Sequence, residues 1–370
     1  MARETGKKIR YAVIGQGYIS QAAVLPAFAH AEENSQLVAL FSSDAEKRRE
    51  LGEKYKLEHV YPYEDYDRVL RSGLVDAVYI ALPNSMHRDY TERAARAGVH
   101  VLCEKPMAVS EEECEAMIAA CKQHQVKLMI AYRLHFEEAN LKAIALLREG
   151  RIGEPRIFES LFTQQVEEGN VRLRKELGGG PLPDVGIYCI NAARYLFGTE
   201  PIEVSAFAAS RGSRFREVPE MVSAVMRFPE DRLASFACSF GASSVSSYRV
   251  IGERGDLLVE PAYELAGTLI HRLTIDGKAD EIKFRKRDQF APELIHFSQC
   301  VLEKREPEPS GQEGLADVRI IRALQRSIET GRPVSLPPFE RVRRPDMTLE
   351  MRRPPVSMPE LVNAAPPSGK

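Results

Sequence analysis

The chain has 370 residues, 44% of them hydrophobic and 28% charged, which is typical of a globular protein long enough for two domains. Its 51 Lys and Arg against 53 Asp and Glu give a net charge of -2, which argues against nucleic acid or an anionic membrane as partner. No apolar run approaches the roughly 20 residues of a membrane span, and the six cysteines lack C-x-x-C spacing. We therefore expect a cytoplasmic protein with reduced thiols and no metal site.

The first predicted unit is a strand, a glycine turn and a helix. An apolar run over residues 9–14 leads into Gly15-Gln16-Gly17, and residues 19–31 follow with helical apolar spacing. Such glycines let the backbone approach a pyrophosphate, which the free N–H groups of the helix start can bind. Ser20 stands where the full G-x-G-x-x-G pattern has its third glycine, and a plain glycine turn is the alternative. The cofactor contacts predicted here are Gly15, Gly17, Tyr18 and Ile19.

A second strand is predicted over residues 37–41, and its end should meet the adenosine ribose. An NAD site usually places an acidic residue there for the 2′-hydroxyl, whereas a 2′-phosphate favours hydroxyls and cations. Ser42 and Lys47 fit a 2′-phosphate, while Asp44 is a favourable N-cap for a helix over residues 45–55. We therefore predict NADP as cofactor and leave NAD open, with a solvated helix face as the alternative for Lys47.

Two further strands, over residues 76–82 and 99–104, end in polar turns. The first turn is predicted to contact the cofactor through Leu82, Pro83, Asn84 and His87, and a connecting loop is the alternative. The second is Glu104-Lys105-Pro106, in which the proline restricts Lys105 to an extended conformation at the ligand-binding edge of the sheet. A solvated, ion-paired lysine is the alternative. A helix capped by Ser110 and Glu113 and a strand over 127–131 complete a doubly wound parallel sheet in a first domain, residues 1–132.

The pattern changes after Tyr132, where a helix over residues 137–149 precedes a series of strands. Predicted strands cover residues 156–163, 202–209, 222–228 and 233–240, which indicates a second, mostly antiparallel α+β domain over 133–340. Gly178-Gly179-Gly180 opens another helix, on which Asp184 and Tyr188 are four residues apart and share one face. The alternative is that Asp184 is an N-cap and Tyr188 a packed aromatic residue. Residues 341–370 form a tail rich in Pro and Arg, predicted to extend along a partner subunit or, over about the last ten residues, to be disordered.

The order of four motifs resembles that of the Gfo/Idh/MocA oxidoreductases, most closely their glucose-fructose oxidoreductase branch. The motifs are Gly15-Gln16-Gly17, Glu104-Lys105-Pro106, Tyr132-Arg133-Leu134-His135 and Asp184-Val185-Gly186-Ile187-Tyr188. The resemblance spans residues 8 to 340 and implies a Rossmann dinucleotide-binding domain followed by a domain with a large open sheet. It further implies a sugar, cyclitol or other polyol as substrate, and a homodimer or homotetramer formed through that sheet. Most members carry His where this chain has Tyr188, whereas the glucose-fructose branch carries Tyr.

The resemblance and the residues together predict hydride transfer between the cofactor and a sugar or polyol carbon. Lys105 would hydrogen-bond the reacting oxygen, and Tyr188 would pass the proton, tuned by Asp184 and Lys105. Glu104, Lys105 and Arg133 complete the predicted cofactor contacts, and the predicted substrate contacts are Lys105, Arg133, His135, Asp184 and Tyr188. Structural hydrogen bonding is the alternative for Arg133 and His135. Two other functions stay open: an NAD-dependent glycosidase that oxidises its sugar transiently, and a nucleotide-binding regulatory protein without turnover.

Overall fold

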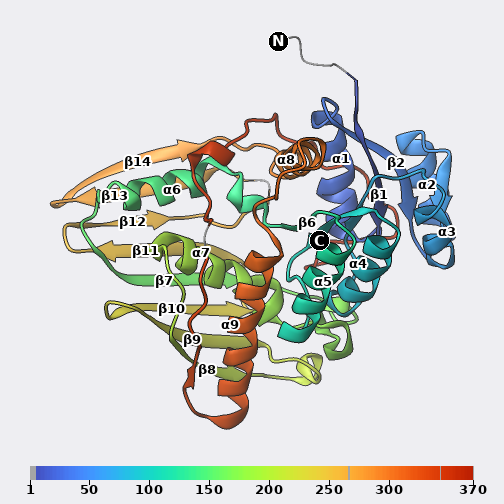
Figure 1. Cartoon of the computed structure of the whole chain (residues 1–370). Helices are drawn as coiled ribbons and strands as arrows, with labels where there is room; N and C mark the ends of the chain where they lie inside the picture. Colours follow the sequence, from blue (N-terminus) through green and yellow to red (C-terminus); the bar gives the residue numbers. More distant parts are fainter. Residues whose placement is uncertain (1–5, 266, 342, 370) are drawn as a thin grey trace.

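A computed structural model describes residues 6–265, 267–341 and 343–369, and its strands form two sheets (Figure 1). The first sheet has the order β3-β2-β1-β4-β5-β6 and pairs all its strands in parallel. Its strands are β1 (Ile9–Ile14), β2 (Ser35–Phe41), β3 (His59–Tyr61), β4 (Ala77–Ile80), β5 (His100–Glu104) and β6 (Leu128–Ala131). This is the doubly wound Rossmann order, so the predicted fold of the first half is confirmed.

Helices cover both faces of this sheet, which is why its strands are continuously apolar. Successive side chains of a strand point to opposite faces, so Val101 and Cys103 join one hydrophobic core while Leu102 joins another. The helices of this half are α1 (Leu25–Ala27), α2 (Ala45–Tyr55), α3 (Tyr66–Leu70), α4 (His87–Arg96) and α5 (Glu111–Gln123). A π-helical turn (Ser20–Val24) leads into α1, and α8 (Ala291–Leu302) from the second half of the chain packs against β1 and β2.

The second sheet has nine strands in the order β14-β13-β12-β11-β7-β10-β9-β8-β15. Its pairings are antiparallel except for the parallel pair of β7 and β10, as predicted for a mostly antiparallel sheet. The strands are β7 (Pro155–Thr163), β8 (Glu203–Ala209), β9 (Met221–Phe228), β10 (Arg232–Ser239), β11 (Val245–Gly252), β12 (Gly255–Val259), β13 (Leu269–Ile275), β14 (Lys278–Phe284) and β15 (Val334–Ser335). The sequence pattern had predicted only β7 to β10 among them.

Among the described residues, helices pack on one face of the nine-stranded sheet only (Figure 1). They are α6 (Glu138–Arg148), α7 (Ile187–Phe197) and α9 (Gly311–Thr330). Along β9 the side chains alternate between exposed and buried, so the opposite face of the sheet is open in the single chain. None of the helices described by the structure combines the length and the apolarity that crossing a membrane requires.

The C-terminal tail is extended, but it runs along its own chain. Arg341 pairs with Glu308 at 2.6 Å, and Arg344 pairs with Glu200 at 2.8 Å. A short 3-10 turn (Met347–Leu349) interrupts it, and the segment up to Gly369 keeps making hydrogen bonds to both halves of the chain. The prediction of disorder for about the last ten residues is therefore wrong for those the structure describes, because Glu360, Val362 and Pro367 are hydrogen-bonded to the folded body.

Candidate active site

The glycine turn after β1 has the space that a dinucleotide needs. Gly15 has φ +98°, and a Cβ there would lie 2.5 Å from the carbonyl oxygen of Ala81, so only glycine fits beside β4. A Cβ on Gly17 would meet nothing within 4 Å, which leaves the exposed side of the turn open to a pyrophosphate. Tyr18 and Ile19 follow, both half-buried, at the start of the helical segment. The residues present therefore fit the phosphates of a nicotinamide dinucleotide.

The end of β2 forms a compact polar turn. The carboxylate of Asp44 caps α2, accepting hydrogen bonds from the backbone N–H of Glu46 at 2.8 Å and of Lys47 at 3.2 Å. The buried hydroxyl of Ser42 accepts from the N–H of Asp44, and Arg48 donates to the carbonyl oxygen of Ser42 at 2.6 Å. Burial lowers the pKa of Lys47. Hydroxyl and ammonium groups therefore gather at this turn, while the acidic side chain is engaged in capping.

The turn after β4 joins the two halves of the chain. Asn84 donates from Nδ2 to the carbonyl oxygen of Gly178 at 2.8 Å. The imidazole of His87 is buried, with Nδ1 3.0 Å from the carbonyl oxygen of Pro106 and Nε2 2.9 Å from that of Leu82. His87 thereby ties the turn after β4 to the turn after β5, and burial lowers its pKa. Pro83 lies between these anchors, half-buried.

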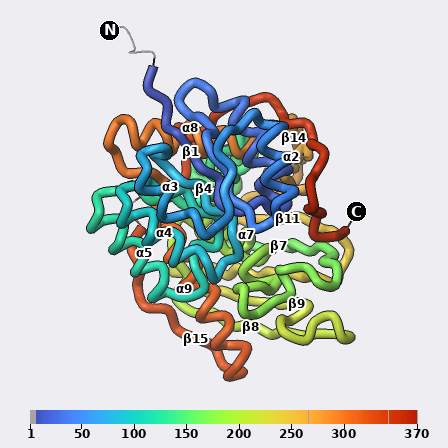
Figure 2. Tube along the Cα trace, turned by 90° about the vertical axis from the view of Figure 1, so that its right-hand side faces the viewer, coloured from blue at the N-terminus to red at the C-terminus, as the bar shows by residue number. Residues whose placement is uncertain are grey.

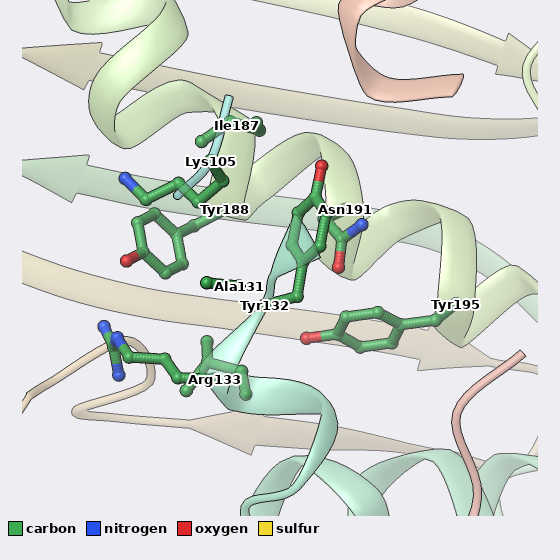
Figure 3. A pocket seen from close by; sticks show the side chains of 9 residues that line it. Lys105, Ala131, Tyr132, Arg133, Ile187, Tyr188, Asn191 and Tyr195 are labelled. Atoms are coloured by element: carbon green, nitrogen blue, oxygen red, sulfur yellow. The ribbon is translucent and has the colours of Figure 1, made fainter. Parts of the chain in front are cut away.

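Lys105 extends from the end of β5 to the start of the helix in the second half (Figure 3). Its Nζ donates to the carbonyl oxygen of Asp184 at 2.9 Å and lies 3.6 Å from Oδ1 of the same residue. Arg172 donates from Nε to the other carboxylate oxygen at 2.9 Å. Burial alone would raise the pKa of Asp184, but Arg172 and Lys105 more than offset it and the net shift is downward. Asp184 is therefore an ionised carboxylate that holds the lysine in place.

The ring of Tyr188 lies between two cations. Nζ of Lys105 is 4.5 Å from the ring centroid and Cζ of Arg133 is 5.1 Å from it, both within cation–π range. Figure 3 shows the ring flanked by these two side chains. The buried guanidinium of Arg133 is fixed by the carbonyl oxygen of Tyr263 at 2.7 Å and by the side chain of Gln289. The structure thus brings together Lys105, Asp184, Tyr188 and Arg133.

Glu104 lies directly before this lysine and points to the first sheet. Tyr79 donates its hydroxyl proton to Oε1 of Glu104 at 2.8 Å, and the N–H of Lys105 is 3.3 Å from Oε2. Burial raises the pKa of Glu104, although Lys105 acts against that shift. The carboxyl group therefore fixes the backbone from which Lys105 projects.

A small pocket opens beside Lys105 and Tyr188 (Figure 3), and its lining includes three polar residues that the sequence analysis had not assigned to the site. The lining residues are Lys105, Ala131, Tyr132, Arg133, Leu134, Ile187, Tyr188, Asn191 and Tyr195. Asn191 and Tyr195 are three and seven residues after Tyr188 and lie on the same face of α7. That spacing is a signal from which both could have been predicted. Arg172 carries no such signal, because it lies in an irregular segment before the glycine run.

His135 is not among the lining residues but lies behind them. Its Nε2 is 2.8 Å from Oδ1 of Asn191, and its ring stacks on Tyr132. Asn191 donates from Nδ2 to Glu313 at 2.7 Å and to Asp317 at 2.9 Å. Because the amide nitrogen is used by two carboxylates, Oδ1 accepts and His135 carries its proton on Nε2. The histidine therefore orients a side chain of the pocket, and its predicted contact with substrate stays a prediction.

Comparison with known proteins identifies the family of both halves of the chain. The profile of an oxidoreductase family with an NAD-binding Rossmann fold matches residues 9–132, and that of the GFO/IDH/MocA C-terminal domain matches residues 140–258. The chain is 35% identical over 340 residues to D-xylose 1-dehydrogenase [NADP(+)] of Haloarcula marismortui, covering 90% of this chain and 94% of the relative.

Two solved structures share the architecture over nearly the whole chain. Aldose-aldose oxidoreductase from Caulobacter crescentus, complexed with glycerol, has a TM-score of 0.85 at 40% identity and covers 89% of this chain and 100% of its own. A 3-ketoreductase from Actinomadura kijaniata, solved with NADP and TDP-benzene, has a TM-score of 0.79 at 27% identity, covering 87% of this chain and 98% of its own. The chain belongs to the Gfo/Idh/MocA family of oxidoreductases.

Proposed function

We propose that this protein is an NADP-dependent oxidoreductase that transfers hydride between the nicotinamide and a CH–OH carbon of a sugar or polyol, acting in the cytoplasm. The observation that carries the proposal is the Lys105 ammonium, held by Asp184 over the ring of Tyr188 at the carboxyl end of β5. Ligands of open α/β sheets bind at that edge. The similarity to an NADP-dependent xylose dehydrogenase and to an aldose-aldose oxidoreductase supports the substrate class.

The first domain would hold the dinucleotide through two groups of residues. Gly15 and Gly17 leave room for the pyrophosphate, and Ser42 and Lys47 supply a hydroxyl and a cation for a 2′-phosphate. Asp44, the acidic residue at the end of β2, is engaged by the helix that it caps. These features favour NADP over NAD. When bound, the nicotinamide supplies the hydride chemistry of the reaction.

The chain's own residues supply orientation and proton transfer. The Lys105 ammonium can donate to the oxygen of the reacting carbon and stabilise negative charge there, at a position fixed by Asp184. Tyr188 presents a hydroxyl beside it that can exchange the substrate proton, since the ammonium contacts the ring face and leaves the hydroxyl accessible. Tyr132, Asn191 and Arg133 line the space where sugar hydroxyls would lie.

The decisive experiment is a panel of aldoses and polyols assayed with NADP+ and NAD+, with Lys105→Met as the variant. We expect reduction of NADP+ by at least one aldose, and loss of turnover in the variant with NADPH still bound. Methionine keeps the length of the side chain and removes the ammonium. Cleavage of a glycoside without net change in nicotinamide absorbance would replace the proposal by the glycosidase function. Binding of NADPH without turnover of any sugar would replace it by a regulatory function.

We also propose that the protein forms a homodimer through the open face of the nine-stranded sheet. Large apolar side chains are exposed on the four neighbouring strands β7, β10, β9 and β8: Ile157, Leu161, Leu233, Val225 and Phe207. Between them lie small residues such as Ser223, Ser235 and Ala237. Charged side chains on this face pair with one another, Arg227 with Glu203 at 3.3 Å and Arg249 with Asp256 at 2.8 Å. Contiguous exposed apolar surface of this kind marks an interaction site. A second copy of the chain presents the same surface, so the two copies can cover each other's apolar face through a two-fold interface.

A further inference from the structure

The last residues of the tail form a strap that connects the two halves of the chain. We call residues 360–369 the C-terminal strap. At one end, the carbonyl oxygen of Glu360 accepts a hydrogen bond at 2.8 Å from Nζ of Lys54, which lies in the first half of the chain. At its other end, the carbonyl oxygen of Pro367 accepts from the N–H of Glu167 at 2.9 Å in the loop after β7. Figure 2 shows this segment, in red, descending past α2 toward the second sheet.

Between these ends the strap is fastened to the glycine turn. The N–H of Val362 donates to Oε1 of Gln21 at 2.7 Å, and Nε2 of Gln21 donates to the carbonyl oxygen of Val362 at 2.9 Å. The same Nε2 lies 3.0 Å from the carbonyl oxygen of Gln16, the central residue of Gly15-Gln16-Gly17. Val362 also packs against the core on this side of the first sheet. One side-chain amide thus links the strap to the turn at which a pyrophosphate would bind.

The next residue of the strap is fastened to the turn that would meet the adenosine ribose. Nδ2 of Asn363 donates to Oδ2 of Asp44 at 3.0 Å and to Oε2 of Glu46 at 2.8 Å. The other oxygen of Asp44 already accepts from the backbone of α2. Each oxygen of the carboxylate therefore already accepts at least one hydrogen bond, which leaves fewer acceptor positions for a ribose 2′-hydroxyl than the acidic residue of an NAD site has. The buried hydroxyl of Ser42 and the half-buried ammonium of Lys47 would then be the groups at this turn that meet a 2′-phosphate.

We propose that the C-terminal strap is part of the cofactor site: it retains the adenosine half of the dinucleotide, and Asn363 determines selectivity for the 2′-phosphate. The inference rests on the proposed function, because it assumes that a dinucleotide binds at Gly15–Gly17. The strap crosses from Asp44 in the first half to Glu167 in the second, over the edge at which the cofactor lies. Entry and release of the dinucleotide then require the strap to detach, and a ribose without a 2′-phosphate gains no contact with Asp44.

The test compares four proteins: the full chain, a chain ending at Pro359, Asn363→Gly and the matched control Glu360→Gln. Glycine adopts the left-handed backbone of position 363, where φ is +45°, without strain, and it removes the side chain that carries the amide. The control changes a strap side chain whose backbone carbonyl makes the contact to Lys54. NADPH release is followed by fluorescence after mixing with excess NADP+, and NADPH and NADH affinities are measured by titration. Thermal unfolding of each protein establishes that it is folded.

We expect the shortened chain to release NADPH at least about tenfold faster than the full chain. Asn363→Gly should shift the ratio of NADPH affinity to NADH affinity several-fold toward NADH. Glu360→Gln should change neither the release rate nor the affinity ratio. Release within twofold of the full chain by the shortened protein overturns retention, and an unchanged ratio in Asn363→Gly overturns the role of Asn363. Either of these two contradicting results leaves the proposed function intact, provided that the full chain oxidises a sugar. A full chain that binds neither dinucleotide overturns both the proposed function and the role of the strap.

Discussion

The proposed reaction depends on the hydroxyl of Tyr188, whereas it depends on the charges of Lys105 and Asp184. Its ring packs against Phe162 and Tyr263 with centroid distances of 5.3 and 5.8 Å and against the two cations, and phenylalanine can keep all of these contacts. We expect Tyr188→Phe to lower kcat by about 10²- to 10⁴-fold, the usual contribution of one acid–base group, with NADPH affinity unchanged. Steady-state kinetics on the best aldose of the panel measure this.

Tyr263→Phe is the matched control for that substitution. Tyr263 belongs to the same aromatic cluster, but its hydroxyl is bound to Ser160 at 2.7 Å inside the second domain. Its variant should lose some stability, because one buried hydrogen bond is removed while Ser160 keeps its bond to the carbonyl oxygen of Ser247, and should keep kcat within a few-fold. A Tyr188→Phe enzyme as fast as the control would show that a different group moves the proton.

The elements that the sequence predicted well are those whose patterns are local. The strands of the first sheet are apolar on both faces, and the Asp184-to-Tyr188 spacing placed both residues on one side of a helical segment, as observed. Among the strands of the second sheet that were missed, β14 lacks such a pattern, because every residue before Phe284 is exposed. Arg172 could not be predicted from sequence, since its contact with Asp184 depends on how the glycine run folds back.

That glycine run is the element that joins the two halves beside the site. Gly178 has φ +78°, and a Cβ there would lie 2.7 Å from Val109 Cγ1 and 2.8 Å from Cβ of Asn84. We expect Gly178→Ala to lower the free energy of unfolding through both backbone strain and this clash, and to raise the KM for the sugar because the Asn84 contact shifts. Overpacking of this kind costs about 1–3 kcal/mol. Chemical denaturation and kinetics measure the two effects.

Gly169→Ala separates the two causes. Gly169 has a similar φ of +83°, but a Cβ there meets nothing within 4 Å, so its variant carries the backbone strain alone. Gly178→Ala should be the less stable of the two by the cost of the clash, and Gly169→Ala should keep its KM. Equal stability and equal KM in both variants would contradict the proposed role of Gly178 at the junction.

At the scale of the whole molecule, the open sheet face predicts the state of assembly. Leu233 lies on β10 beside the exposed Ile157 of β7, near the middle of the sheet. In a two-fold interface, a charged side chain at position 233 would be buried close to the same charge on the second subunit. We expect Leu233→Glu to convert a dimer into a monomer in size-exclusion chromatography with light scattering. Lys278→Glu, on the exposed outer strand β14, is the control and should leave the dimer intact. A wild-type protein that is monomeric at micromolar concentration would rule out the interface.

The response of the whole fold to pH sums opposing contributions from its buried ionisable groups. Burial lowers the pKa of His271 and of His296 to about 4, whereas burial raises the pKa of Glu308 to about 7. A histidine that is neutral when folded stabilises the fold above its unfolded pKa of about 6.5, and this stability is lost as pH falls toward 4. A carboxyl group with a raised pKa stabilises the fold below about 4.5 and loses that contribution as pH rises through 7. The pH profile of the wild type alone therefore does not isolate either group.

A substitution at His271 isolates its contribution, because the difference between variant and wild type cancels every other group. The imidazole is buried against Phe284, with ring centroids 4.5 Å apart, and the ammonium of Lys142 acts in the same direction as burial. Phenylalanine fills a similar space and takes up no proton. We expect the stability of His271→Phe relative to wild type to rise by about 2 kcal/mol between pH 7.5 and pH 5, since each pH unit below the unfolded pKa costs the wild type about 1.4 kcal/mol. Urea denaturation at the two pH values measures this, with His124→Phe at the end of α5 as the control. A relative stability that stays constant over this range would mean that His271 takes up its proton in the folded state.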